Sequence, residues 1–529
     1  MKNRIVLISL SVLLLSLPWL GFPGYTLWVA FVPLLILQEK LSREKNRKGK
    51  PRRFFGYAAV TFLVWNIVTV YWIKNATWIG VVAAFAVNTF ISTVSFLVYH
   101  YVWRRAPRAL AYTVLVSFWI AYEYVYINGE ISFPWLILGN GFANTVRAVQ
   151  WYEYTGILGG SLWVWIVNLL VYEAWRKFRA CRCAGAFALP VVIALTPLVV
   201  SWAMYARYQE AERPVTVTVV QPNLDPYEEK FVLPQWDQAR LILSLAERAP
   251  ADADYIVTPE TSFDYTLWEE NLPDNPLIRT LREFMRTHYP GAQLIIGATT
   301  FRRYGSKAEA SATARTNSNI DFWYDVYNSA IRIDTASVSV YHKSKLVAGA
   351  EMIPHYRRFE FLKSLSLELG GVSGMLGVDP ERSTFASEDG TQVGVAICYE
   401  SVYGEYCTEY VGKGAEALFI ITNDGWWGDT PGYRQHFSFA RLRAIELRRS
   451  VARSANTGIS GFIGQRGDVL AKTGWDERTA LTGTINLNDR LTFYARHGDM
   501  IGRICLYTTL LSLLYFIAYR RRKKDYLVD

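Results

Sequence analysis

The chain has 529 residues, of which 51% are hydrophobic, and a formal net charge of +10 at neutral pH. Its length exceeds that of one ordinary domain, and the mean hydropathy of +0.10 favours a membrane protein with a large water-exposed part. Residues 207–499 contain 31 basic and 38 acidic side chains, so the positive excess lies elsewhere, and a nucleic-acid-binding surface is excluded. The five cysteines are scattered and odd in number, which excludes a disulfide framework.

Eight apolar runs have about the length that crosses a bilayer as a helix. They cover 4–20, 24–39, 54–73, 79–103, 109–127, 157–175, 186–206 and 502–519. The first run lacks a cleavage site and is followed almost at once by the second, which favours an uncleaved span over a signal peptide. We therefore predict seven spans over 1–207, a folded domain over 208–500, and an eighth span with a basic tail over 501–529.

Every second loop between these runs is basic. Basic residues gather at 40–53, 104–108, 176–182 and 520–524, whereas the intervening loops hold little beyond Lys74 and Arg147. Basic loops remain in the cytoplasm. This pattern predicts that both termini are cytoplasmic and that 208–500 lies on the outer side of the membrane.

Residues 214–490 alternate short apolar runs with amphipathic stretches. The clearest helix covers 434–453, where apolar residues follow a 3,4 spacing and arginines occupy the opposite face. The strand candidates are 215–220, 255–257, 294–296, 331–341, 393–397, 418–421 and 459–463. This alternation predicts a layered α/β sandwich.

Three of these strands end on polar groups that complement one another chemically. Glu260, Lys343 and Cys398 follow the strands at 255–257, 331–341 and 393–397. A nucleophilic thiol needs a base and a positive charge for the developing oxyanion. Each residue alone has a simpler interpretation, as a loop carboxylate, a solvated charge and a core cysteine, but together they indicate a catalytic site.

Four blocks around these residues resemble the nitrilase superfamily, in its order. They are Thr258-Pro-Glu260-Thr, Tyr327-Asn328-Ser329, the stretch from Tyr341 through Lys343 to Glu351 and Pro354, and Ile397-Cys398-Tyr399-Glu400. Framed by eight apolar runs, they resemble the apolipoprotein N-acyltransferases of Gram-negative bacteria over nearly the whole chain. The resemblance implies an α-helical transmembrane bundle in the bacterial inner membrane and a periplasmic αββα sandwich.

The resemblance also implies roles for the three catalytic positions. Cys398 would take an acyl chain from a phospholipid, phosphatidylethanolamine above all, and hold it as a thioester. Glu260 would be the general base, and Lys343 would stabilise the oxyanion together with the backbone amide of Tyr399. The acceptor would be the α-amine of the diacylglyceryl-cysteine that begins an apolipoprotein.

Further positions follow from the same resemblance. Glu351 would support the catalytic group, Tyr399, Glu400 and Trp426 would shape the acyl or substrate pocket, and Asn328 belongs to the same set. A monomer is expected. No metal or organic cofactor is expected, because the six histidines form no ligand-spaced pair.

The sequence departs from many relatives at two places. Ala348-Gly349-Ala350 replaces Pro-Phe-Gly before Glu351, and Lys230-Phe231 replaces a Lys-Trp pair, which bears on the fit of a lid and of the donor lipid. The apolar stretch 359–369, flanked by glycines, is either such a lid dipping into the membrane or an amphipathic helix on the domain's own core.

Three alternatives differ in class. A membrane-tethered amidase of the same superfamily would hydrolyse a small amide, but a single anchor would suffice for it. A non-catalytic lipid or lipoprotein carrier would not need all three catalytic residue types. A transporter would be expected to carry several charged residues within its spans. The spans hold almost no ionisable residues, with Glu123 the main exception.

Overall fold

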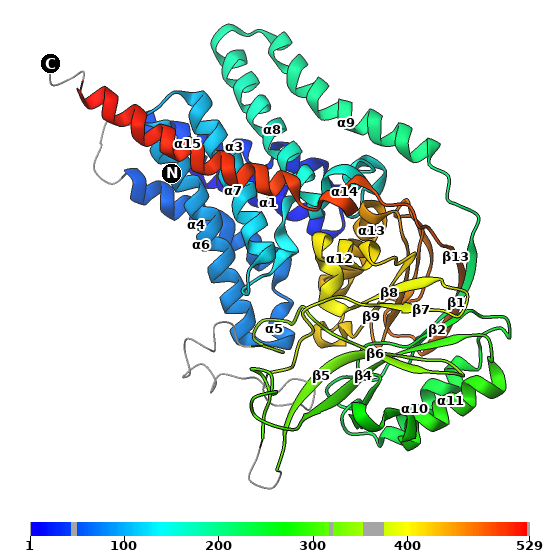
Figure 1. Cartoon of the computed structure of the whole chain (residues 1–529). Coiled ribbons are helices and arrows are strands. Elements are labelled where there is room, and N and C mark those ends of the chain that lie inside the picture. Colours follow the sequence, from blue (N-terminus) through cyan, green and yellow to red (C-terminus); the bar gives the residue numbers. More distant parts are fainter. Residues whose placement is uncertain (1, 44–49, 317–320, 353–374, 526–529) are drawn as a thin grey trace. The chain divides into compact units, whose positions relative to one another are not determined.

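The computed structural model describes residues 2–43, 50–316, 321–352 and 375–525. The chain forms two compact units (Figure 1). One unit comprises Met1–Lys74, Trp78–Arg207 and His497–Asp529, and the other comprises Asn75–Thr77 and Tyr208–Arg496.

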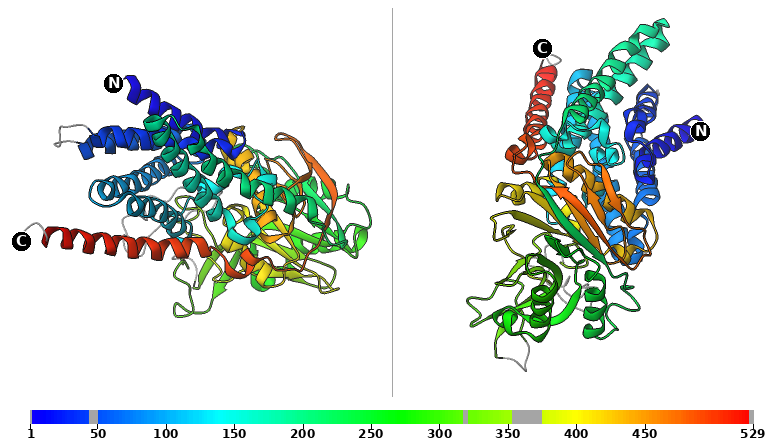
Figure 2. Two further views of the ribbon diagram at one scale, coloured as in Figure 1. Left: turned by 90° about the horizontal axis from the view of Figure 1, so that it is seen from above. Right: turned by 90° about the vertical axis from the view of Figure 1, so that its right-hand side faces the viewer.

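Long apolar helices build the first unit. Seven helical segments of the described chain have the length and composition to cross a membrane: Asn3–Leu20, Arg52–Val70, Trp78–Trp103, Arg108–Asn128, Tyr152–Cys181, Ala184–Arg207 and Met500–Arg522. They contain α1 (Lys2–Ser16), α4 (Lys50–Val70), α6 (Trp78–Trp103), α7 (Arg108–Asn128), α8 (Tyr152–Cys181), α9 (Ala188–Arg207) and α15 (Met500–Asp525). Figure 2 shows α8 and α9 as two long rods joined by a short turn.

The run predicted at 24–39 does not form one long helix, so the count of eight spans is not confirmed. It is divided into α2 (Leu27–Ala30) and α3 (Val32–Arg43), of four and twelve residues. Pro33 explains the break, because proline lacks an N–H and its ring clashes with the preceding turn of a helix. The side chain of Asn168 accepts from the Phe31 N–H at 2.8 Å and donates to the Leu27 carbonyl at 2.7 Å. The backbone N–H and carbonyl groups that the break leaves without partners in the helix therefore form hydrogen bonds within the protein.

Two β-sheets form the centre of the second unit. The first has the order β13-β1-β2-β4-β5-β6, with β3 also on β4, and the second has the order β12-β11-β10-β9-β8-β7. The strands of the first sheet are β1 (Pro214–Gln221), β2 (Tyr255–Val257), β3 (Phe263–Trp268), β4 (Gln293–Tyr304), β5 (Trp323–Ile333), β6 (Val338–His342) and β13 (Thr479–Asn486). Those of the second are β7 (Thr384–Ala386), β8 (Gln392–Ile397), β9 (Ala417–Thr422), β10 (Ser450–Ala455), β11 (Gly461–Ile463) and β12 (Val469–Lys472).

Helices cover the outer faces of the two sheets. Helices α10 (Gln235–Ala246) and α11 (Pro276–His288) lie against the first sheet, and α12 (Gly404–Gly412) and α13 (Pro431–Leu447) lie against the second (Figure 1). Strand β1 packs on β10 between the layers. The predicted αββα sandwich is therefore confirmed.

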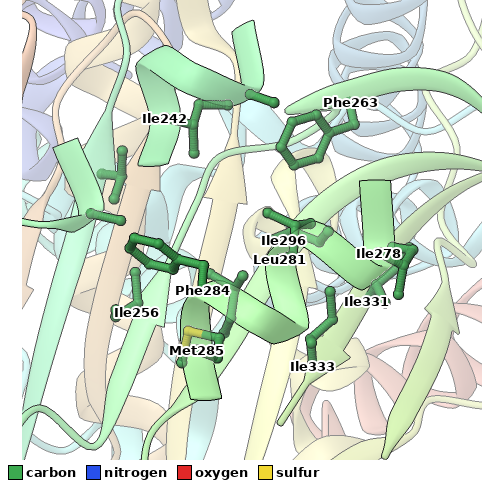
Figure 3. Close-up of a cluster of buried hydrophobic side chains, with 14 of the residues drawn as sticks. Ile242, Ile256, Phe263, Ile278, Leu281, Phe284, Met285, Ile296, Ile331 and Ile333 are labelled. Carbon is green, nitrogen blue, oxygen red and sulfur yellow. The ribbon is translucent and has the colours of Figure 1, made fainter. Parts of the chain in front are cut away.

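A hydrophobic cluster anchors α10 and α11 to the first sheet (Figure 3). On α11, Ile278, Leu281 and Met285 recur at helical spacing and face Ile256 of β2 and Ile296 of β4. Helix α11 begins where Asn275 caps the N–H of Leu277 and Pro276 occupies the first turn. Since β2 leads directly to Glu260, this packing also sets the position of that carboxylate.

Two secondary-structure predictions are wrong. The strand expected at 331–341 is a hairpin of β5 and β6, because Asp334 accepts from the N–H groups of Ala336 and Ser337 and closes a turn. The helix expected at 434–453 ends at Leu447, because Arg448 adopts a left-handed conformation with φ of 48°.

Of the arginines in that segment, Arg434 is exposed and Arg441 is half-buried, but the others are buried. Arg443 is fully buried and pairs with Glu446 at 2.8 Å, while Arg453 lies on the buried strand β10. Strand β10 escaped prediction because its apolar residues continue the helical spacing of α13.

Candidate active site

The three predicted catalytic residues follow strands β2, β6 and β8. Strand β2 is parallel to β4, and β6 is antiparallel to β5, which is antiparallel to β4. Strands β2 and β6 therefore run in the same direction, and Glu260 and Lys343 reach the same edge of the first sheet. Cys398 follows β8 of the second sheet directly. The candidate site thus receives residues from the ends of strands in both sheets, and strand ends are where catalytic groups of α/β proteins gather.

Lys343 is bound by two carboxylates. Its Nζ lies 2.9 Å from Oε1 of Glu260 and 2.8 Å from Oε1 of Glu351, and its side chain is 1% exposed. Asn328 Nδ2 donates to the same two oxygens, at 2.8 and 3.0 Å. The N–H of Asn423 donates to the other Glu260 oxygen at 3.2 Å. The structure therefore brings Asn328 and Glu351 together with the predicted pair.

These contacts determine the protonation of the pair. Burial raises the pKa of Glu260, but the Lys343 charge and hydrogen bonds from Lys343, Asn328 and the Cys398 thiol outweigh it and leave the pKa below its ordinary value. Burial lowers the pKa of Lys343, but the charges of Glu260 and Glu351 raise it well above the ordinary value. Glu260 is thus a carboxylate and Lys343 an ammonium at neutral pH.

Cys398 lies at a sharp turn between β8 and the short helix η9 (Cys398–Val402). Its φ of 50° is in the left-handed region, which costs a residue with a side chain about 1–3 kcal/mol. Burial and the Glu260 charge raise the pKa of its thiol well above the ordinary value, although Lys343 opposes this. Cys398 therefore rests as a thiol, whose proton would have to be removed for the sulfur to act as a nucleophile.

A glycine allows Glu260 to approach β4. A Cβ at Gly297 would lie 2.3 Å from the Pro259 carbonyl oxygen and 2.7 Å from the Glu260 Cα. Thr261, the next residue, has a φ of 49°. Sequence analysis missed Gly297, whose only signal is a glycine within a buried strand.

The departure at 348–350 forms a tight turn. Gly349 has a φ of 87°, and its N–H donates to the Met352 carbonyl at 2.7 Å. The turn folds Glu351 back, so that its Oε2 accepts from the Val347 N–H at 2.8 Å while Oε1 reaches Lys343. The turn at Ala348-Gly349-Ala350 therefore holds Glu351 in contact with Lys343. The stretch 359–369, for which a lid and an amphipathic helix are the two expectations, lies outside the described residues.

Glu400 is fully buried beside the site. One carboxylate oxygen accepts from Tyr341 Oη at 2.9 Å and from the Ser344 N–H at 2.7 Å. The other accepts from the Ile397 N–H at 2.8 Å and Tyr410 Oη at 3.0 Å. Glu400 thus connects the loop after Lys343 to the strand before Cys398, which supports the catalytic residues from within the core.

Aromatic side chains surround the remaining predicted positions. Trp426 lies in η10 (Asp424–Trp427), where its ring stacks on Phe231 at 6.0 Å and meets Tyr227 edge-on at 5.3 Å. Phe231, which replaces a tryptophan, therefore still supplies an aromatic partner to Trp426. Tyr399 is buried and packs edge-on against Tyr403.

Several charged residues lie around the site although sequence analysis assigned no role to them there. Lys230 is buried, and its Nζ lies 3.4 Å from the Glu260 carbonyl oxygen. Burial lowers the pKa of Lys230 to about 8, although Glu260 and Asp264 raise it. Asp424, His436 and Arg453 form a buried network next to Cys398. Asp424 lies beside Trp426 in the sequence, but its partners come from distant segments. Within the described part of the chain, no group of three His, Cys, Asp or Glu residues could hold a metal ion.

Comparisons with known proteins agree with this geometry. Residues 216–492 match the family model of the carbon-nitrogen hydrolases, and residues 11–170 match that of the apolipoprotein N-acyltransferase N-terminal domain. The apolipoprotein N-acyltransferase of Chlorobaculum tepidum is 31% identical over 514 residues, which covers 94% of this chain and 93% of the relative. The chain belongs to the apolipoprotein N-acyltransferase family.

Other relatives carry the same name. The apolipoprotein N-acyltransferase of Geobacter metallireducens is 26% identical, covering 94% of this chain and 91% of its own. Among solved structures, an amidase of the nitrilase superfamily from Nesterenkonia is 16% identical with a TM-score of 0.36, covering 56% of this chain and 98% of its own. The family predicted from the four sequence blocks is confirmed. Together with the long apolar helices, this membership identifies the chain as an enzyme integral to a membrane.

Proposed function

We propose that the chain transfers an acyl chain from a phospholipid to the N-terminal α-amine of a diacylglyceryl-cysteine apolipoprotein, through a thioester on Cys398. The carrying observation is the arrangement of Glu260, Lys343 and Glu351 around the turn that holds Cys398. Family membership supports the substrates. All these groups come from one chain, so a monomer suffices.

In the first step, the Cys398 sulfur attacks the ester carbonyl carbon while Glu260 takes the thiol proton. Because the thiol pKa is raised and the Glu260 pKa is lowered, this transfer becomes favourable only as negative charge moves to the carbonyl oxygen. The Lys343 ammonium and the Tyr399 amide stabilise that oxyanion. The ester C–O bond then breaks, Glu260 returns the proton to the leaving oxygen, and a lysophospholipid departs.

In the second step, the amine of the acceptor attacks the thioester carbonyl. Glu260 takes a proton from the attacking nitrogen, the C–S bond breaks, and the proton passes to the sulfur. An amide and the free thiol result. Dividing one acyl transfer in two in this manner lowers each barrier. Glu351 and Asn328 hold Lys343 and Glu260 in place during both steps.

The proposal places the enzyme in the bacterial inner membrane, with phosphatidylethanolamine as donor and the second unit in the periplasm. Carrying a phospholipid chain through water costs about 0.8 kcal/mol per CH₂, so a lipid donor requires a membrane-anchored enzyme. The alternation of basic loops supports the orientation.

Intact mass spectrometry of the purified chain tests the proposal. After incubation with phosphatidylethanolamine, the wild type should gain one acyl mass that hydroxylamine removes, and Cys398→Ala should not. A diacylglyceryl-cysteine peptide should discharge the adduct. Discharge by water alone would instead indicate a lipid hydrolase, and an adduct that persists in Cys398→Ala would exclude Cys398 as the nucleophile.

A further inference from the structure

A buried network of polar side chains contacts the backbone of the nucleophile. Arg453 Nη2 donates to Asp424 Oδ2 at 2.6 Å, and His436 Nδ1 lies 2.9 Å from Asp424 Oδ1 and 3.1 Å from Arg453 Nη2. On its other side, His436 Nε2 lies 3.3 Å from the Cys398 carbonyl oxygen and 3.1 Å from Ser401 Oγ. All four side chains are at most 2% exposed. The proposed chemistry uses none of them.

The contact with Cys398 requires a hydrogen on Nε2 of His436. A carbonyl oxygen only accepts, so the contact at 3.3 Å is a hydrogen bond only if Nε2 is the donor. Ser401 Oγ donates to the same carbonyl at 2.7 Å. Asp424 and Arg453 hold the opposite side of the ring and fix its orientation. The Cys398 carbonyl therefore accepts hydrogen bonds from two side chains, those of Ser401 and His436.

The orientation of this carbonyl bears on catalysis through the geometry of the peptide bond. The Cys398 carbonyl and the Tyr399 N–H belong to one planar trans peptide and point in opposite directions. A donor that holds the carbonyl therefore also aims the Tyr399 N–H. Cys398 is in the left-handed region, a conformation that persists only where surrounding contacts enforce it.

We infer that His436 is a positioning residue: its Nε2–H holds the Cys398 carbonyl and thereby aims the Tyr399 amide at the acyl oxyanion. This inference rests on the proposed acylation of Cys398. It distinguishes His436 from Lys343, which contacts the reacting oxygen itself. It also explains why a buried histidine lies between Asp424 and the nucleophile.

Two substitutions of nearly equal polarity separate the roles of the two ring nitrogens. In His436→Gln, the amide nitrogen reaches about as far as Nε2 and can still donate to the carbonyl. In His436→Asn, it reaches only as far as Nδ1, so the contact with Cys398 is lost. We expect single-turnover acylation by phosphatidylethanolamine to stay within about threefold of wild type in His436→Gln. In His436→Asn we expect it to fall about 30-fold or more, with little change in the donor concentration for half-maximal rate.

Alkylation of Cys398 by iodoacetamide provides the second readout. This reaction uses the thiol but forms no oxyanion, so we expect His436→Asn to keep the wild-type alkylation rate within about threefold. Parallel loss of acylation and alkylation would show a general disturbance of the site and would overturn the inference. Equal acylation by the two variants, whether high or low, would overturn it as well.

Ser401→Ala covers the case in which His436→Asn does not fold, because it deletes the other side-chain donor to the same carbonyl. We expect acylation about three- to tenfold slower with unchanged alkylation. Unchanged acylation there would overturn the inference. The wild type and Cys398→Ala are run alongside. Absence of the Cys398 adduct from the wild type contradicts the proposed function itself. Normal acylation of the wild type and of the His436 and Ser401 variants contradicts only the role of His436.

Discussion

Lys343 and Glu260 keep opposite charges in a site where burial alone would neutralise both. Each pKa moves toward the charged form because the partner, Glu351 and Asn328 lie within hydrogen-bond distance. The pKa of the Cys398 thiol shifts toward the neutral form instead, so the thiol stays protonated. In the proposed mechanism, the proton to be transferred therefore rests on the Cys398 sulfur, and Glu260 is the carboxylate that receives it.

The rate of Cys398 acylation should consequently vary little with pH. Because the Glu260 pKa lies below its ordinary value of 4.5 and the Lys343 pKa lies well above 10.5, neither group titrates near neutrality. We expect single-turnover acylation to stay within about twofold from about pH 5 to about pH 7, below the pKa of about 8 of Lys230, which also contacts the site. An acid limb centred between pH 6 and 7 would contradict the assignment of Glu260 as an ionised base.

His342, the residue before Lys343, should make stability depend on pH. Burial lowers its pKa, but hydrogen bonds and charges from Asp379 and Glu269 raise it to about 9. Since the folded pKa exceeds the unfolded value of 6.5, the stabilisation is complete below pH 6.5 and is lost as pH rises through about 9. It amounts to about 3 kcal/mol at most.

His342→Gln removes the charge and keeps a polar side chain, which allows this contribution to be measured. The Tm of the detergent-solubilised variant should lie several degrees below that of wild type at pH 6 and approach it by pH 10. A Tm difference that is the same at both pH values would show that packing, including the stacking of His342 on Tyr327, carries the effect instead.

Strand β4 positions the base by close contact between backbones. The chain at Glu260 passes so near to Gly297 that a Cβ there would overlap the backbone of residues 259–261. The hydrophobic cluster under α10 and α11 holds β2 and β4 in register on the other face (Figure 3). The packing of the sheet therefore helps to fix the position of the Glu260 carboxylate.

Gly297→Ala should slow acylation strongly and also lower stability. Relieving the overlap must move the backbone at Glu260, and a displacement of about 1 Å costs about 100-fold in rate, whereas overpacking costs about 1–3 kcal/mol. Gly291→Ala is the matched control, because no atom lies within 4 Å of its added Cβ. Acylation should be lost in the first variant and kept in the second; equal rates would contradict the role of Gly297.

The two units differ in the way expected of a lipid-modifying enzyme, which needs one part to lie in the membrane and another to carry the polar site. One unit consists of long apolar helices and the other of a sandwich that carries the polar chemistry. The broken pair α2 and α3 decides the topology, because the chain reaches residue 208 after an odd number of crossings only if this pair also crosses. The basic loops at 40–53 and 176–182 favour that outcome.

Reporter and protease experiments on the full chain can decide the topology. Green fluorescent protein fused after residue 529 should fluoresce, because it folds in the cytoplasm, and protease added to spheroplasts should cut within 208–496. A non-fluorescent fusion whose second unit resists protease until the membrane is opened would show that α2 and α3 do not cross.

The sequence alone determined the family, the apolar runs, the αββα layers and the positions of Glu260, Lys343 and Cys398. These features depend on local properties, namely run length, alternation and the residues at strand ends. Only the tertiary structure decided that Pro33 and Asn168 break one run, that Arg443 and Arg453 are buried, and that Gly297, Lys230 and His436 contact the site. Those outcomes depend on partners that are distant in sequence. Burying a charge requires a counter-charge, and bringing Glu260 close to β4 requires a residue without a side chain in that strand. Neither requirement is visible in a single segment.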